Sequence, residues 1–223
     1  PPTPVPTYYD VPTYSPSFSP SRRPSTSPSS PPTVSPSVKP NLSPSASPSN
    51  SSPAYYLNET AKLTASDGEF GDEFGSSVHV SGTIAVVSAY EDDDNGNDSG
   101  SVYVYEKDES TGVWNETAKL TSSDGVDYDD YGWSISVSGN IIIVGAHQND
   151  DKGPDSGSVY IYEKDDLTGV WNETAKLTAS DGVDNDFFGW SVSVSGNIAV
   201  VGAYGDDDKG SYTGSAYIFE KDD

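Results

Sequence analysis

Three acidic loops contain the residues of this 223-residue chain whose types and spacing could do chemistry. They read EDDDNGNDSG (91–100), QNDDKGPDSG (148–157) and GDDDKGSYTG (205–214). Clustered carboxylates with glycine at sharp turns supply the oxygen ligands and bendable backbone that Ca²⁺ requires. Adjacent carboxylates also repel one another without a cation. The loops therefore predict calcium as a cofactor, with these candidate ligands: Asp92, Asp93, Asp94, Asp98, Asp150, Asp151, Asp155, Asp206, Asp207 and Asp208.

The spacing of these carboxylates leaves a second interpretation open. None of the loops shows the alternating D-x-D-x-D-G pattern of a dedicated calcium loop. Neighbouring side chains in an extended loop point apart, so a solvated acidic turn explains the pattern equally well. A second set of aspartates (Asp67 and Asp72, with their counterparts near 124–129 and 181–186) is predicted to cap backbone N–H groups in turns.

The two histidines give no catalytic signature. His79 lies in the alternating segment SSVHVS, and His147 follows an apolar run where Tyr90 and Tyr204 follow similar runs. The chain has no cysteine, no repeated Ser/His/Asp constellation and no phosphate-binding loop, so nothing indicates nucleophilic catalysis. We predict that the protein is not an enzyme and that both histidines are structural.

The acidic loops belong to a unit of about 55 residues that occurs three times. Asn58, Asn115 and Asn172 mark a period of 57 residues. In the third copy a short leading segment ends at Leu177, and three strands are predicted at 190–195, 198–203 and 215–220. The run IAVVGA (198–203) predicts a strand buried on both faces. Four antiparallel strands per unit are typical of a propeller blade, so the predicted fold is all-β, a propeller-type array of three blades.

Paired motifs frame the second and third strands of each copy. Phe74-Gly75, Tyr131-Gly132 and Phe188-Gly189 open the second strand, and Ser88-Ala89, Gly145-Ala146 and Gly202-Ala203 close the third. In these motifs the chain resembles the FG-GAP repeat, the blade unit of the integrin α-subunit propeller and of many secreted proteins. The resemblance covers roughly residues 55–223 and implies an extracellular propeller. The calcium loop of that family has no counterpart between the second and third strands here, where only Ser-Gly-Asn or Ser-Gly-Thr stands.

Residues 1–53 have a different composition from the repeats. They hold sixteen of the seventeen prolines and little that could be buried. From Pro12 to Pro48 a proline falls at every fourth position, which favours an extended polyproline II stalk; an unmodified disordered linker is the alternative. The pattern resembles hydroxyproline-rich and mucin-like glycoproteins, which implies modification at Pro12, Pro16, Pro20, Pro24, Pro28, Pro32, Pro36, Pro40, Pro44 and Pro48.

N-glycosylation sequons occur in both parts of the chain. Three of them fall at one repeat position, a coincidence that a repeated polar turn also explains. The predicted glycan sites are Asn41, Asn50, Asn58, Asn97, Asn115 and Asn172.

Charge and composition restrict the class of partner. The repeats carry thirty-four acidic residues against eight lysines, which excludes nucleic acid and argues against binding to an anionic membrane. No apolar run is long enough for membrane insertion. The predicted organisation is a stalk at 1–53 and repeats at 54–113, 114–170 and 171–223. The sequence favours an extracellular structural or adhesive glycoprotein of a surface coat, wall or fibre. A calcium-dependent module that binds a protein or glycan ligand is the alternative, and the propeller of a larger secreted enzyme is a more distant one.

The number of blades predicts association. Closed propellers have four to eight blades, and three are too few to close. Either further repeats follow Asp223, or the open faces of the first and third repeats pack on another surface. For the second case we expect self-association, or association with other repeat-containing chains, and a filament where the rotation does not close, because an open stack has unlike ends. Apolar surface near Leu63, Leu120, Leu177 or the FG positions is predicted to lie between blades or between chains.

Overall fold

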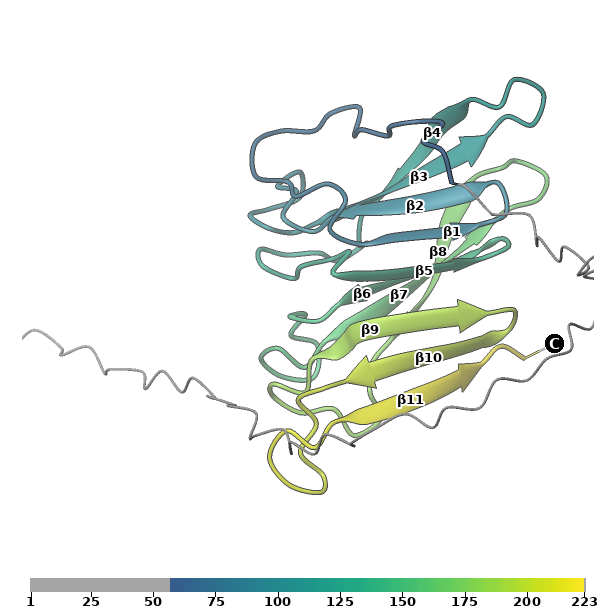
Figure 1. The fold of residues 1–223 in the computed structure, drawn as a ribbon. Coiled ribbons are helices and arrows are strands. Elements are labelled where there is room, and N and C mark those ends of the chain that lie inside the picture. Colours follow the sequence, from purple (N-terminus) through teal and green to yellow (C-terminus); the bar gives the residue numbers. More distant parts are fainter. Residues whose placement is uncertain (1–56, 223) are drawn as a thin grey trace, which may run out of the picture. The chain divides into compact units, whose positions relative to one another are not determined.

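A computed structural model of the protein describes residues 57–222, and every regular element in this range is a β-strand (Figure 1). The first sheet has the order β1 (Val78–Ser81), β2 (Ile84–Ala89), β3 (Ser101–Lys107), β4 (Trp114–Leu120). The second has the order β5 (Ser134–Ser138), β6 (Ile141–Ala146), β7 (Ser158–Lys164), β8 (Trp171–Leu177). The third has β10 (Ile198–Ala203) between β9 (Phe188–Ser195) and β11 (Ser215–Glu220). The predicted stalk, with Asn41, Asn50 and its prolines, lies outside the described residues.

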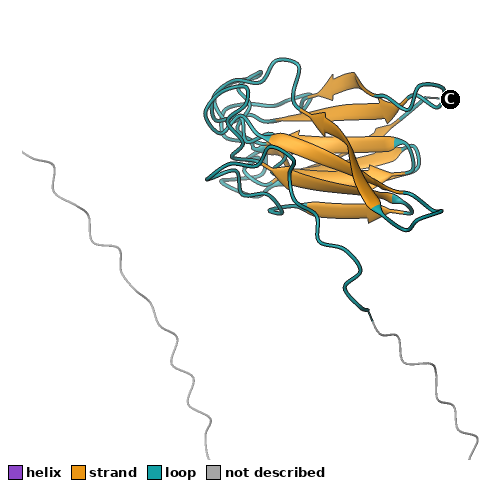
Figure 2. Ribbon diagram, turned by 90° about the horizontal axis from the view of Figure 1, so that it is seen from above, coloured by secondary structure: helices purple, strands orange, loops and turns teal. Residues whose placement is uncertain are grey.

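The prediction of an all-β fold with antiparallel blades is confirmed. All eight neighbouring strand pairs in residues 57–222 are antiparallel. The hairpin from the first to the second strand of each sheet turns at a glycine with positive φ, such as Gly82 (φ 59°), a conformation that glycine adopts without a Cβ penalty. Figure 2 shows the longer loops gathered on one side of the strands.

The grouping of strands into sheets differs in one detail from the prediction. β4 begins the second repeat, yet it pairs with β3 of the first, and β8 pairs in the same way with β7. The leading segment of a repeat therefore completes the blade of the preceding repeat. As a consequence the third sheet has three strands, and the leading segment of the first repeat, residues 57–63, forms no strand.

The three sheets pack face to face, and the contacts between them recur with the repeat (Figure 1). The N–H of Val137 donates to Nδ1 of His79 over 3.2 Å, and the N–H of Val194 donates to Oγ of Ser136 over 3.1 Å. Leu120 and Leu177 lie in the apolar clusters between sheets, as predicted. Recurrence of the same contacts shows that each blade docks on the next in one way.

Burial of the central strand depends on a neighbouring blade. β2 and β6 are buried along most of their length on both faces, as the apolar run predicts. β10 alternates instead, with Ile198 and Val200 exposed and Ala199 and Val201 buried. No sheet in residues 57–222 covers its outer face, so the same sequence pattern is buried on both faces only where a further blade follows.

The FG motif explains how the blades approach each other. Phe188 is fully buried, and its ring meets those of Tyr217 and Phe219 edge to face on its own blade. Gly189 has φ 91°, and a Cβ there would lie 2.7 Å from the carbonyl oxygen of Ser158 on the preceding blade. A glycine is therefore required both by the backbone conformation and by the close contact between blades.

Candidate functional site: acidic loops, aromatic row and blade edges

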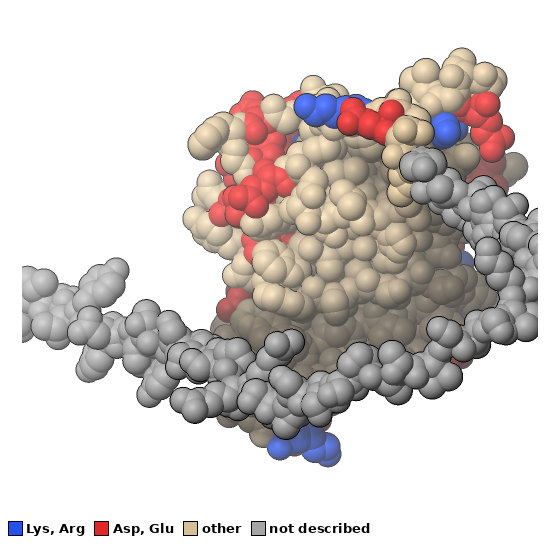
Figure 3. Space-filling view, viewed as in Figure 1, with Lys and Arg blue, Asp and Glu red and all other residues tan. Residues whose placement is uncertain are grey.

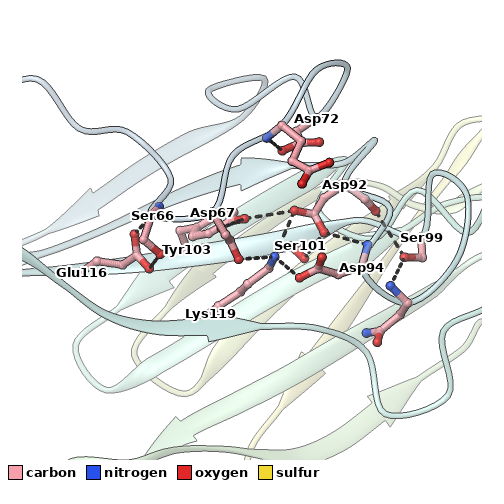
Figure 4. A network of polar contacts seen from close by, with 12 residues as sticks. Ser66, Asp67, Asp72, Asp92, Asp94, Ser99, Ser101, Tyr103, Glu116 and Lys119 are labelled. Atoms are coloured by element: carbon pink, nitrogen blue, oxygen red, sulfur yellow. Dashed lines mark hydrogen bonds and ion pairs between the residues drawn. The ribbon is translucent and has the colours of Figure 1, made fainter.

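A lysine lies at the centre of the first acidic loop (Figure 4). Nζ of Lys119, on β4, lies 2.9 Å from Asp67, 3.1 Å from Asp92 and 2.5 Å from Asp94. The hydroxyl of Tyr103 also donates to Asp67 and Asp92, over 2.8 and 3.0 Å. Burial opposes the charge of Lys119, but the hydrogen bonds to Asp94 and Asp67 prevail and raise its pKa above the usual range. A strand of one repeat thus neutralises carboxylates of the repeat before it.

The second blade repeats this arrangement, and the third does not. Lys176 on β8 lies 2.8 Å from Asp124 and 2.7 Å from Asp151. In the third blade the corresponding carboxylates are Asp181, Asp206 and Asp208, and within residues 57–222 none of them has a lysine partner. Tyr217 alone links Asp181 and Asp206, with hydroxyl hydrogen bonds of 2.9 Å. The lysines of the first two blades lie on the fourth strand of their sheet, and the third sheet has three strands in the described part of the chain.

The structure separates the candidate calcium ligands by role. Asp93 and Asp150 accept the N–H groups of Asp98 and Asp155 over 2.8 Å and so close their own loops. Asp92 and Asp206 are buried and point toward the strands, whereas Asp207 and Asp208 are exposed. Across residues 57–222, no group of three or more acidic or histidine side chains has the arrangement of a metal site. Calcium binding stays a prediction.

Half of the aspartates predicted to cap turns before the second strand do so. Asp67, Asp124 and Asp181 instead accept the hydroxyls of Tyr103, Tyr160 and Tyr217. Asp72, Asp129 and Asp186 each accept a backbone N–H from the residue three positions before, over 2.6, 3.1 and 2.8 Å. Burial raises the pKa of Asp129 and of Asp186. These carboxylates fix the loop beside the FG motif in each repeat, and their role is structural.

An aromatic row that the sequence pattern did not predict crosses the blades on the loop side. The ring centroids of Tyr90 and Trp133 are 5.3 Å apart, those of Trp133 and Trp190 are 4.9 Å apart, and those of Trp190 and Tyr204 are 4.4 Å apart. Tyr204 is 46% exposed. In the sequence, aromatic residues follow the FG motif (Trp133 and Trp190) and the apolar run (Tyr90 and Tyr204). Only the pairing of the strands brings these positions together.

His147 lies inside this row and is structural. Its ring centroid is 4.4 Å from that of Trp133 and 4.9 Å from that of Trp190. Burial lowers the pKa of His147 to about 4, although Asp130 lies 3.9 Å away. Burial also raises the pKa of Asp130 to about 6. The neutral imidazole therefore packs as an aromatic ring at neutral pH.

The predicted glycan acceptors of the repeats are accessible. Asn58, Asn97, Asn115 and Asn172 are exposed. Asn115 and Asn172 lie within the outer strands β4 and β8, rather than before the strand as the sequence pattern predicts. Their side-chain amides donate to the carbonyl oxygens of Val113 and Val170. This contact is what the alternative interpretation, a repeated polar turn, predicts.

Acidic residues concentrate on the loop side of the molecule. Figure 3 shows a group of them along the left edge and others at the top and upper right, while the surface between them is mostly uncharged. No helix in residues 57–222 has the length and apolar character that crossing a membrane requires.

The class of protein follows from these blades: three antiparallel sheets joined by FG motifs and close glycine contacts form a propeller-type array. The family model of the FG-GAP repeat matches residues 57–105, 114–162 and 171–219, and the chain belongs to this family. A comparison with curated proteins finds no match. FG-GAP repeats form propeller modules that are often extracellular or adhesive and are generally not catalytic.

Proposed function

We propose that the protein is an extracellular structural or adhesive component of a surface coat, wall or fibre, without catalysis, whose blades associate with other copies. The observation that supports it best is the apolar character of both end faces. Val78 and Val80 on the first blade are 68% and 59% exposed, while their counterparts Ile135 and Val137 on the second are 6% and 2% exposed. On the third blade Ile218 is 67% exposed. Such faces mark protein contacts.

Sedimentation velocity of the full chain tests this proposal. We expect the unmodified protein to sediment as an assembly, and a Val200→Asp/Ile218→Asp variant to sediment as a monomer because two charges would be buried in the contact. The matched control is Val113→Asp/Val170→Asp, since both valines are 54% exposed on hairpins away from the end faces. A monomeric unmodified protein, or dissociation caused equally by the control, contradicts the proposal.

The surface location also implies covalent glycans. Asn58, Asn115 and Asn172 occupy equivalent exposed positions, so we expect all three to be occupied. Glycosidase treatment and peptide mapping of native material measure the occupancy; three bare asparagines contradict it. For the stalk at 1–53, the expectation is hydroxylated and glycosylated prolines, and a stalk peptide at its bare sequence mass contradicts that part.

The aromatic row favours a second candidate, a module that binds a protein or glycan ligand with calcium. Exposed aromatic rings present an apolar face to a ligand, and the acidic loops beside them accept hydrogen bonds from hydroxyl groups. Titration of tryptophan fluorescence with an oligosaccharide panel, in calcium and in EDTA, tests it. We expect Tyr204→Ala to weaken binding and Phe70→Ala, which changes a fully exposed ring outside the row, to leave it unchanged. No fluorescence change with any sugar contradicts the glycan form.

A further inference from the structure

Within residues 57–222, one strand-forming segment and one strand edge are both left without partners. The segment LNETAKL (57–63) differs at one position from WNETAKL, which forms β4 and β8. In the structure it forms no strand, and Leu57 is fully exposed. At the other end of the described chain, β11 pairs with β10 alone, whereas its counterparts β3 and β7 each pair on both edges (Figure 1). An unpaired edge is a template for another strand.

A cavity marks where the missing strand would lie. It has a volume of about 250 Å³ and lies between the second and third blades, among Ile141, Ile161, Ala175, Ala199 and Phe219. Their counterparts one repeat earlier are Ile84, Val104, Ala118, Ile142 and Tyr162. These five residues form an apolar cluster with Trp171, the first residue of β8. Trp171 is 7% exposed there. The cavity therefore corresponds to the first side chain of a fourth strand, which is Leu57 in LNETAKL.

The polar groups around β11 match the same segment. Lys62 is the counterpart of Lys119 and Lys176, and Asp181, Asp206 and Asp208 are the carboxylates without a lysine. Glu116 and Glu173 each accept the hydroxyl of a serine of the preceding repeat over 2.7 Å. Their counterpart in the first repeat is Glu59, and Ser180 is the corresponding serine. Charge complementarity selects this segment over an arbitrary apolar strand.

Backbone groups of the two end faces are complementary as well. The N–H groups of Tyr128 and Tyr131 donate to carbonyls of Asn97 and Ser99, and those of Asn185 and Phe188 donate to Pro154 and Ser156. One repeat on, the carbonyls of Ser211 and Thr213 receive no such bond within residues 57–222. One repeat back, the N–H groups of Gly71 and Phe74 make none there. The third blade thus presents the free acceptors, and the first blade the free donors, of the backbone contact that joins neighbouring blades.

We propose that two copies of this chain form a closed six-bladed ring, in which each donates residues 57–63 as the outer strand of the other's third blade. This rests on the self-association in the proposed function and names its partner and geometry. The register of β7 with β8 places Ala61 opposite Ile218, Lys62 opposite Tyr217 and Leu57 opposite Lys221. A head-to-tail contact closes into a ring when its rotation permits. Two copies of the three described blades supply six, which lies within the four to eight blades of known propellers.

Leu57 provides a direct measure of the donated strand. It is fully exposed in the single chain, so replacing it leaves the contacts of that chain unchanged. Leu57→Trp restores the residue found in β4 and β8, and we expect it to lower the dissociation constant of the dimer by about tenfold, because more apolar surface is buried. Leu57→Asp is expected to raise that constant. Equal dissociation constants for both variants overturn strand donation.

Disulfide trapping of the full chain tests the ring, since the protein has no cysteine of its own. The variant Ala61→Cys/Ile218→Cys is oxidised, and its products are separated on a non-reducing gel and weighed. We expect a covalent dimer with no free thiol. The controls are each single variant and the mismatched pair Ala61→Cys/Val170→Cys, which are expected to give no dimer of this kind.

The remaining outcomes separate the ring from the proposed function. A ladder of covalent polymers overturns the ring and leaves association intact. A disulfide within one chain, or free thiols in a sample that sediments as an assembly, overturns strand donation alone. Free thiols in a sample that sediments as a monomer overturn both the ring and the proposed function.

Discussion

Replacement of Lys119 by methionine is the change that most directly tests how the acidic loops are held. Methionine keeps the packing of the side chain but removes the charge shared by Asp67, Asp92 and Asp94. It also removes the contact of Nζ with the ring of Tyr103, 5.1 Å away. The carboxylate of Asp92, whose side chain is 5% exposed, is then left without its cation.

The expected loss of stability follows from which partners are buried. Removing one member of a buried ion pair costs about 3–5 kcal/mol. Asp92 keeps hydrogen bonds from Ser101 and Tyr103 over 3.0 Å, which lowers that cost. The side chains of Asp67 and Asp94 are 45% and 61% exposed, and exposed pairs contribute at most about 1 kcal/mol. We therefore expect a loss of about 2–3 kcal/mol in the free energy of unfolding.

Urea denaturation followed by tryptophan fluorescence measures this loss. For a folded unit of this size the same change lowers the melting temperature by roughly 5–10 °C. The control is Lys152→Met, because Lys152 is exposed and makes no ion pair within the described residues. A difference below about 0.5 kcal/mol between Lys119→Met and the control would refute this role for the lysine.

Three further changes address other parts of the structure. The pKa of His147 is lowered from 6.5 to about 4 in the fold, so its contribution to stability is lost as pH falls through that window; the buried Asp130, with a raised pKa of about 6, acts in the opposite direction. As pH falls from 6.5 to 4, the free energy of unfolding of His147→Tyr should therefore rise by up to ~3 kcal/mol relative to that of the unmodified protein, as measured by urea denaturation. Equal pH slopes for the two proteins contradict this. Gly189→Ala should cost at least ~2 kcal/mol because of the contact with Ser158, against ~1 kcal/mol for Gly196→Ala, which has positive φ but open space; equal losses contradict the argument from close contact. If the acidic loops bind calcium, thermal melts should show a higher midpoint in calcium than in EDTA, and Asp206→Asn/Asp208→Asn should reduce the rise; an unchanged midpoint at moderate ionic strength refutes calcium binding.

Local patterns were sufficient to predict the blades. Alternation in the second strand, the apolar third strand and the glycine turns specify strands and hairpins within a few residues, and the FG motif places one blade beside the next. The fourth strand was harder, because WNETAKL has the same pattern whichever blade it joins. Its pairing with the preceding blade depends on contacts such as that between Lys119 and Asp67, which are 52 residues apart.

The candidate site could be predicted only in part for the same reason. Asp72, Asp129 and Asp186 cap turns within three residues, as predicted. The prediction was wrong for Asp67, Asp124 and Asp181, which accept tyrosine hydroxyls 36 residues away in the sequence. The carboxylates of the acidic loops are neutralised by lysines from another repeat, and the aromatic row joins residues of all three repeats. Both depend on the stacking of blades, which no local pattern records. Val86 and Val200 occupy equivalent positions, yet Val86 is fully buried and Val200 is 39% exposed. Burial at this position therefore also depends on a neighbouring blade.

Hydrogen exchange at β11 measures the central claim, that a strand from a second copy completes the third blade. At protein concentrations above the dissociation constant, the amides of β11 that do not bond to β10 should exchange as slowly as the equivalent amides of β7. On dilution their protection should fall, while that of β7 stays constant. Fast exchange at β11 at every concentration, with β7 protected, would contradict the claim.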